Sequence, residues 1–200
     1  MTERALRLTG IGGQGVQLAA RTLGVAAASQ GLSAMVFGEY AGMMRGGNTD
    51  ATVVIGTRRL VTPPTVSRPW GAIAMHHEFW ADVERRMSPG GVVIVDGSVF
   101  RGEPARDDLI VVTVEATAAA TGLGNARGGS MVTLGALAAA TGVVTVESLE
   151  AAAGEVLPSY RAQHAEANAA AIRAGYELVA ERATEAWPDE KREAEVGAGR

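Results

Sequence analysis

The 200-residue chain contains no cysteine and only one lysine, Lys191. Without cysteine it cannot form a disulfide, a thiolate zinc site, a cysteine nucleophile or a cysteine-ligated iron–sulfur cluster. No apolar run approaches the roughly 18 residues that a membrane-spanning helix requires. Because nothing in the chain calls for an oxidising compartment or a bilayer, we expect a cytoplasmic protein that does not contact membranes.

Recognisable catalytic motifs are missing as well. The chain has no Gly-x-Ser-x-Gly nucleophile elbow, no Walker A lysine and no Tyr-x-x-x-Lys pair. The formal net charge of −4 gives no general attraction to nucleic acid. We therefore expect neither a self-contained catalytic site nor a nucleic-acid-binding surface.

Glycine and alanine are abundant instead. Glycine accounts for 26 of the 200 residues, about twice its average usage. So many small residues favour close approaches between backbones, within the domain or between subunits. The length suits one domain. We expect a single α/β domain over residues 1–185, followed by a disordered charged tail over residues 186–200.

Apolar patterns alternate between strand and helix periods along the chain. Continuous β-branched runs such as Val92–Val95 suit strands that are covered on both faces, as in a parallel sheet. The predicted strands cover residues 5–9, 34–37, 51–55, 70–75, 92–95 and 109–114, and the predicted helices cover 16–30, 78–87, 131–141, 146–156 and the segment from 159 onward. This order predicts an α/β fold with a Rossmann-like, doubly wound, mostly parallel sheet and C-terminal helices.

A glycine motif, Gly10-x-Gly12-x-x-Gly15, lies between the first predicted strand and the first predicted helix. Glycine lets backbone N–H groups approach an anion at the positive end of a helix. A dinucleotide site also needs an acidic residue about 20 positions later, and Glu39 matches that requirement only loosely. Three interpretations stay open: a nucleotide cofactor, another anion or backbone contact, or packing alone.

Two further segments carry polar groups of interest. Arg45-Gly46-Gly47-Asn48 combines a glycine turn with a guanidinium group, which suits a carboxylate or a phosphate, although it could equally be a solvated loop. His76-His77 follows a predicted strand and superficially suggests metal ligands. Because adjacent side chains point apart in a strand or a helix, and no third ligand is near, we expect no metal site there.

Five motifs follow one another in a particular order. They are Gly-Ile-Gly-Gly-Gln-Gly-Val at 10–16, Met-Arg-Gly-Gly at 44–47, the strand at 53–55, Pro-Gly-Gly-Val-Val-Ile-Val-Asp at 89–96 and Leu-Gly-Ala-Leu at 134–137. Together they resemble the gamma subunit of the thiamine-diphosphate-dependent 2-oxoacid:acceptor (ferredoxin) oxidoreductases. The resemblance covers roughly residues 5–180, and the first glycine motif coupled to the downstream Arg-Gly-Gly is its most specific part.

The resemblance implies an enzyme that oxidises a 2-oxoacid to acyl-CoA, the 2-oxoacid being pyruvate, 2-oxoglutarate or a branched-chain or aryl compound. It implies that thiamine-binding alpha and beta subunits hold thiamine diphosphate and Mg²⁺, and that a ferredoxin-like subunit holds the iron–sulfur clusters. Electrons would then pass to ferredoxin or, through a flavin subunit, to NAD. This chain would hold none of these cofactors by itself, in agreement with its lack of cysteine.

In such an enzyme the gamma subunit would help to bind coenzyme A and close over the thiamine site. A basic residue early in the first helix holds CoA phosphates in related members, and Arg21 stands at that position. The resemblance implies no catalytic residue and no metal ligand in this chain. The residues it implies for contact with CoA, or for the face toward thiamine, are Gly12, Gly13, Gln14, Gly15, Arg21, Arg45, Gly46 and Gly47.

Two rival functions remain open. A free-standing Rossmann NAD(P)-dependent oxidoreductase is supported by the glycine motif alone. A purely structural assembly subunit would use its glycines for packing and for subunit interfaces, and would touch neither CoA nor thiamine.

Overall fold

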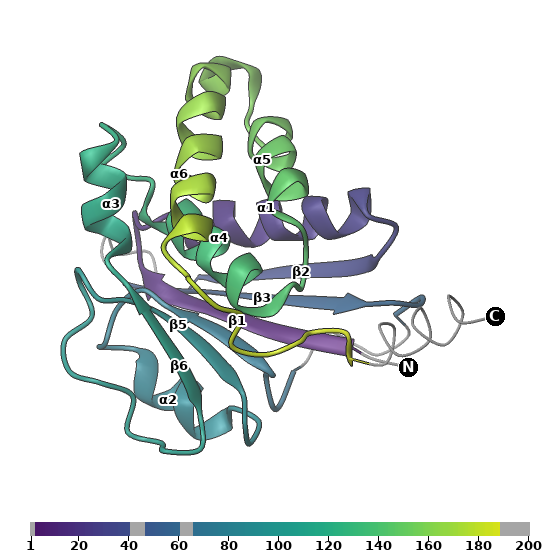
Figure 1. Ribbon diagram of the computed structural model, residues 1–200, viewed down its shortest axis with the longest axis vertical. Coiled ribbons are helices and arrows are strands. Elements are labelled where there is room, and N and C mark those ends of the chain that lie inside the picture. Colours follow the sequence, from purple (N-terminus) through teal and green to yellow (C-terminus); the bar gives the residue numbers. More distant parts are fainter. Residues whose placement is uncertain (1–2, 41–46, 61–65, 189–200) are drawn as a thin grey trace.

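A six-stranded sheet runs through the centre of the fold, with helices on both faces (Figure 1). The computed structural model describes residues 3–40, 47–60 and 66–188. The strands are β1 (Glu3–Ile11), β2 (Ser33–Tyr40), β3 (Asn48–Gly56), β4 (Gly71–Ala74), β5 (Val92–Asp96) and β6 (Ile110–Val114). The helices are α1 (Val16–Ser29), α2 (Trp80–Arg86), α3 (Ala116–Gly122), α4 (Gly129–Thr141), α5 (Val146–Glu155), the 3₁₀ helix η1 (Ser159–His164) and α6 (Ala165–Glu177).

The strand order is β2-β3-β1-β4-β5-β6. β1, β4, β5 and β6 pair in parallel, whereas β3 is antiparallel to both β1 and β2. The predicted α/β fold with a mostly parallel sheet is confirmed. The antiparallel strand could not be predicted, because an apolar run such as Val53–Ile55 has the same pattern whichever way the strand runs.

The sheet separates two hydrophobic cores. Helices α1 and α4 lie against one face, with α5 and α6 packed onto these two helices, and α2 covers the other face (Figure 1). On the α2 face, Ala72 and Val93 pack against Trp80 and Val83 of that helix. Because β4 and β5 are buried on both faces, β4 consists of small and apolar residues and β5 is apolar from Val92 to Val95, before its last residue Asp96, as the sequence predicts for central parallel strands.

Helix α4 has no solvent-facing side: all of its residues are buried. Two of its buried hydroxyl groups bond within the helix: Thr133 Oγ1 donates to the Ser130 carbonyl (2.9 Å) and Thr141 Oγ1 to the Leu137 carbonyl (2.6 Å). Two glycines let α4 and α6 touch backbone to backbone. A Cβ atom on Gly135 would overlap a carbonyl oxygen of α6, and one on Gly175 would overlap the Val132 carbonyl oxygen of α4.

The C-terminal part differs in detail from the prediction. The helix expected from residue 159 begins as the 3₁₀ helix η1 and continues as α6 only from Ala165. After α6 the chain returns to the core, where Ala186 is buried and Trp187 Nε1 donates to the Val143 carbonyl (3.1 Å). Residues 189–200, most of the predicted disordered tail, lie outside the described residues.

The contact between α4 and α6 predicts how adding a single methyl group changes the stability of the fold. Gly175→Ala should lower the free energy of unfolding by about 1–3 kcal/mol, because the new Cβ atom meets a rigid carbonyl and forces the two helices apart. Urea unfolding followed by circular dichroism measures the change.

Gly122→Ala is the matched control for this substitution. Gly122 ends α3, and a Cβ atom there would meet no atom within 4 Å. The same substitution should therefore stabilise the chain by roughly 0.5–1 kcal/mol through the lower entropy of its unfolded state. Equal effects of the two substitutions would contradict a close backbone contact between α4 and α6.

Candidate functional site

The glycine motif forms the loop between β1 and α1, at the carboxyl end of β1. Gln14 braces this loop: its Oε1 atom accepts a hydrogen bond from the Ile11 N–H (2.8 Å), and its Nε2 atom donates to the Met75 carbonyl (2.9 Å). Since Met75 directly follows β4, one side chain ties together the ends of two neighbouring parallel strands. The Gln14 side chain is therefore engaged in holding the loop to the sheet.

The glycines of the loop have different surroundings. The Gly12 N–H donates to the Gly47 carbonyl (3.0 Å), which joins the loop to the chain before β3. Gly15 has a φ of 83°, and a Cβ atom there would lie 2.6 Å from Ser130 Oγ. Gly13 has a φ of 102° and faces open space. Gly15 is thus needed for packing onto α4, whereas the loop stays open at Gly13.

Two of the predicted site residues, Arg45 and Gly46, lie outside the described residues. Gly47 is described, and its hydrogen bond from Gly12 places the end of that segment beside the first glycine loop. Gly47, the described end of the second glycine segment, therefore lies at the carboxyl end of β1.

An open cleft of about 710 Å³ lies beside the loop. Its residues come from the segments that follow β1, β4 and β5, namely Ile11, Gln14, His76, His77, Gly97, Ser98, Val99, Phe100 and Arg101. Open α/β sheets bind ligands at this edge, outside the carboxyl ends of their strands. The lining combines apolar side chains with two imidazoles, a hydroxyl and a guanidinium group, which suits a ligand with both apolar and anionic parts.

A buried carboxylate fixes the chain after β5. Asp96 is fully buried; its Oδ1 atom accepts from the Ser98 N–H (3.2 Å) and the Thr117 N–H (3.1 Å), and its Oδ2 atom accepts from Thr117 Oγ1 (2.6 Å). These bonds pin the turn after β5 to the start of α3. The start of the turn that carries Arg101 and the other cleft residues is therefore held in place.

The two adjacent histidines do not point apart, so that expectation is wrong. Their rings stack with centroids 4.4 Å apart and an interplanar angle of 24°. Strand and helix periodicity does not apply here, because His76 and His77 lie in the irregular segment between β4 and α2. Phe100 meets the His77 ring edge-on at 6.2 Å, which closes the stack against the turn after β5.

The environment of His76 disfavours positive charge on its ring. Burial, followed by the neighbouring His77, lowers the pKa of His76 below its ordinary value, although Glu78 opposes this shift. The Glu78 N–H donates to His76 Nδ1 (3.3 Å), so that nitrogen is the unprotonated one. The other ring nitrogen, Nε2, then carries the proton of the neutral imidazole.

Arg21 lies apart from this cleft. It lines a separate cavity between α1, β2 and the end of α5, together with Val36 and the carboxylate-bearing Glu155. The structure thus brings Gly12, Gly13, Gln14 and Gly15 together but leaves Arg21 on the flank of α1.

The strand order argues against a dinucleotide site. In dinucleotide-binding sheets the second strand lies directly beside the first, which brings its terminal acidic residue close to the glycine loop. Here β3 separates β2 from β1, so Glu39 is one strand further away. Throughout the described ranges, no three His, Cys, Asp or Glu side chains come close enough to hold a metal ion, and no helix is long and apolar enough to cross a bilayer.

Sequence reasoning did not single out Ser98 and Arg101. The available signal was their position, since both follow the predicted strand at 92–95, whose carboxyl end lies at the ligand-binding edge of a parallel sheet. Nothing in the local sequence showed that this turn lies opposite the glycine loop.

The half-buried position of His76 predicts a pH-dependent stability. Because the pKa of His76 is lower in the folded chain than its ordinary value, the unfolded chain binds the proton more readily, so stability should fall as the pH drops below about 6.5 and through the lowered pKa. His76→Gln removes the titrating imidazole, so the stability of this variant should decline less steeply as the pH falls. Thermal unfolding between about pH 7.5 and 5.5 measures the decline. His164→Gln, at an exposed histidine in η1, is the control and should keep the wild-type slope; equal slopes in both variants would refute the role of His76.

The chain matches known proteins over most of its length. Residues 5–178 match the pyruvate ferredoxin/flavodoxin oxidoreductase family. The 2-oxoglutarate synthase subunit KorC of Methanothermobacter thermautotrophicus is 34% identical over 185 residues, which cover 89% of this chain and 96% of that protein. The ketoisovalerate oxidoreductase subunit VorA of the same organism is 30% identical over 139 residues, or 68% of this chain and 28% of that protein.

Solved structures share the fold. The gamma subunit of a keto/oxoacid ferredoxin oxidoreductase from Geobacter sulfurreducens has a TM-score of 0.77 at 26% identity, over 89% of this chain and 97% of that one. A 2-oxoglutarate:ferredoxin oxidoreductase from Magnetococcus marinus has a TM-score of 0.78 at 19% identity, over 89% of this chain and 31% of that one. The chain therefore belongs to the pyruvate ferredoxin/flavodoxin oxidoreductase family and corresponds to the gamma subunits of 2-oxoacid:ferredoxin oxidoreductases, as its motifs predict.

Proposed function

We propose that this chain receives coenzyme A in a cytoplasmic 2-oxoacid oxidoreductase, with the cleft at the carboxyl edge of the sheet as its binding site. The overall reaction converts a 2-oxoacid and CoA to acyl-CoA and CO₂, releasing two electrons and one proton. Because the chain has no cysteine to hold a cluster, those electrons must leave through partner subunits.

The composition of the cleft carries this proposal. Coenzyme A combines an apolar, hydrogen-bonding pantetheine arm with a strongly anionic phosphate end. Arg101 offers a guanidinium group for phosphate, and Val99 and Phe100 offer apolar contact for the arm. Among solved relatives of the same fold, the Magnetococcus marinus enzyme was determined with 2-oxoglutarate, coenzyme A and succinyl-CoA bound.

The remaining cofactors belong to partner subunits in this proposal. Thiamine-binding subunits would hold thiamine diphosphate and Mg²⁺, and a ferredoxin-like subunit the iron–sulfur clusters, with ferredoxin or, through a flavin subunit, NAD as acceptor. Thiamine diphosphate supplies the decarboxylation chemistry when bound, while the glycine loop and the cleft of this chain position CoA beside it. In the Magnetococcus marinus enzyme the matching region is 31% of a longer chain, which supports a role as one part of a larger enzyme.

The 2-oxoacid to test first is 2-oxoglutarate, because two relatives at 34% identity are 2-oxoglutarate synthase subunits. Native anaerobic purification from the source cells should bring a thiamine-binding subunit and an iron–sulfur protein with this chain. Reduction of an acceptor dye by 2-oxoglutarate, 2-oxoisovalerate and pyruvate then ranks the substrates. A chain that elutes alone would contradict the proposal.

Arg101→Ala tests the CoA site in the assembled enzyme. It should raise the KM for CoA by about 10-fold or more, the loss expected for one charge-assisted hydrogen bond to phosphate, and leave the KM for the 2-oxoacid unchanged. Arg161→Ala, at an exposed arginine of η1, is the matched control and should change neither constant. An unchanged KM for CoA in Arg101→Ala would remove Arg101 from the site, and an unchanged KM in both Arg101→Ala and Arg21→Ala would favour the purely structural subunit.

Arg21→Ala separates the cleft from the cavity on the flank of α1. If Arg21 also contacts CoA phosphates, its removal should raise the KM for CoA, but by less than Arg101→Ala, because Glu155 lines the same cavity and opposes an anion there. A larger effect of Arg21→Ala would place the phosphates on the flank of α1, and no effect would remove Arg21 from the site.

A further inference from the structure

A buried ion pair lies on the α2 side of the sheet, where β1 and β3 pair. Arg7 donates from Nη2 to Asp50 Oδ2 (2.7 Å) and from Nη1 to Thr52 Oγ1 (2.8 Å). Only 13% of the Arg7 side chain and 10% of the Asp50 side chain are exposed. These bonds hold the Arg7 guanidinium group at a fixed place on the surface of the sheet.

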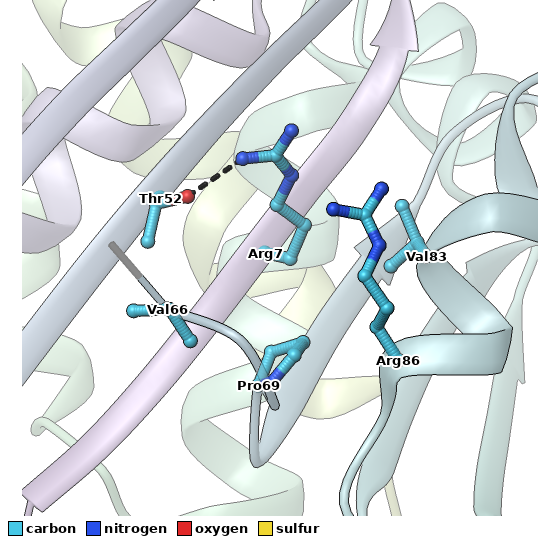
Figure 2. A pocket seen from close by; sticks show the side chains of 6 residues that line it. All are labelled: Arg7, Thr52, Val66, Pro69, Val83 and Arg86. Atoms are coloured by element: carbon cyan, nitrogen blue, oxygen red, sulfur yellow. Dashed lines mark hydrogen bonds between the residues drawn. The ribbon is translucent and has the colours of Figure 1, made fainter. Parts of the chain in front are cut away.

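A small pocket opens beside this pair, between β1, the segment before β4 and the end of α2 (Figure 2). Its lining residues are Arg7, Thr52, Val66, Pro69, Val83 and Arg86. Figure 2 shows the Arg7 and Arg86 side chains with their guanidinium groups turned the same way. We call this site the arginine pocket; it combines two cations with apolar walls.

The guanidinium group of Arg86 is only partly engaged by the described residues. Its Nε atom donates to the Asp82 carbonyl (3.0 Å), and the Asp82 carboxylate is paired with Arg85 instead. In the described part of the chain, no carboxylate forms an ion pair with Arg86. The terminal nitrogens of Arg86 therefore remain available to an anion from outside the chain.

Three more exposed arginines lie toward the amino edge of the sheet, on the segments before β4 and after β3. Arg68 is exposed and lies next to Ser88, whose hydroxyl donates to the Arg68 carbonyl (3.3 Å). Arg58 and Arg59 are exposed just beyond β3, whose last residue pairs with the start of β1. Within residues 3–40, 47–60 and 66–188, none of these three has a carboxylate partner. Together with Arg86, these arginines add positive charge at the amino edge of the sheet, where β1 begins with Glu3, although the whole chain has a net charge of −4.

We propose that the arginine pocket docks an acidic side chain presented by another subunit of the enzyme. The carboxylate of that side chain binds Arg86 at the mouth of the pocket, beside the half-buried Val66, and the exposed arginines at this edge of the sheet attract the acidic surface on which it stands. The inference rests on the proposed function only in requiring a multi-subunit enzyme. It concerns the edge of the sheet opposite the CoA cleft, so the two sites are independent.

Charge complementarity favours a protein partner over a free carboxylate. A pocket with one available guanidinium group holds a small anion weakly, because water competes for an exposed ion pair. On a protein partner, the same ion pair is desolvated by the surrounding contacts, and the nearby arginines steer the encounter. Association should therefore weaken as salt is raised.

Arg86→Glu tests the docking site in the enzyme reconstituted from its co-expressed subunits. We expect the dissociation constant of the chain from its partners to rise at least about tenfold at low salt. The wild-type affinity should also fall as NaCl is raised from about 0.05 to 0.5 M. Arg161→Glu, which makes the same charge change on η1, should bind like the wild type; equal affinity of the two variants would overturn the proposal.

Arg68→Glu and a measurement of thermal unfolding test whether Arg86→Glu weakens the complex merely by destabilising the chain. Arg68→Glu should weaken the complex in the same direction without touching α2, and both variants should unfold thermally like the wild type. If millimolar glutarate stabilises the isolated wild-type chain but not Arg86→Glu, and the complex is unaffected by Arg86→Glu, the pocket binds a small carboxylate and the docking proposal fails.

The absence of native cysteine allows a direct identification of the partner surface. Ser67→Cys introduces a single thiol at an exposed position next to Val66 of the arginine pocket. A photoreactive maleimide attached there should cross-link, in the assembled enzyme, to a partner segment that contains Asp or Glu. Cross-links to a segment without acidic residues, or none above the level of an Arg161→Cys control, would overturn the proposal.

Discussion

The complete burial of α4 is the constraint on which the fold depends. This helix contacts the sheet, α1, α3, α5 and α6, and has no face left for water. A helix enclosed in this way must be built of small and apolar residues, and its neighbours must be able to approach its backbone. Gly135 and Gly175 meet that need against each other's helices, which explains part of the high glycine content.

The enclosed helix also determines where the candidate site can lie. Since α4 begins with Gly129 and Ser130 directly beneath the glycine loop, that loop must pass close to it, and Gly15 leaves room for Ser130. The cleft is then built around two anchors, the Gln14 amide between β1 and β4 and the Asp96 carboxylate after β5. Both anchors hold loops in place, which leaves Arg101, Ser98 and the imidazoles to meet a ligand.

The antiparallel strand β3 gives the two edges of the sheet different properties. Its insertion beside β1 moves β2 away from the glycine loop and makes a dinucleotide site implausible. The same insertion places Asp50 and Thr52 opposite Arg7 and so fixes the guanidinium group of the arginine pocket. The proposed ligand cleft and the proposed docking surface therefore lie at opposite edges of the sheet, as suits a subunit that works inside an assembly.

Local patterns in the sequence determine much of this protein. The β-branched runs identify the central strands, the glycine motif identifies the loop at the carboxyl end of β1, and the lack of cysteine excludes clusters held by cysteines of this chain. These features depend on residues close together in the chain. Only the tertiary structure decided four other features. These are the strand directions, the stacking of His76 on His77, the distance of Arg21 from the cleft, and the placing of Arg7 and Arg86 in one pocket. Each of these depends on segments that the folded sheet and its irregular connections bring together, which no local period encodes.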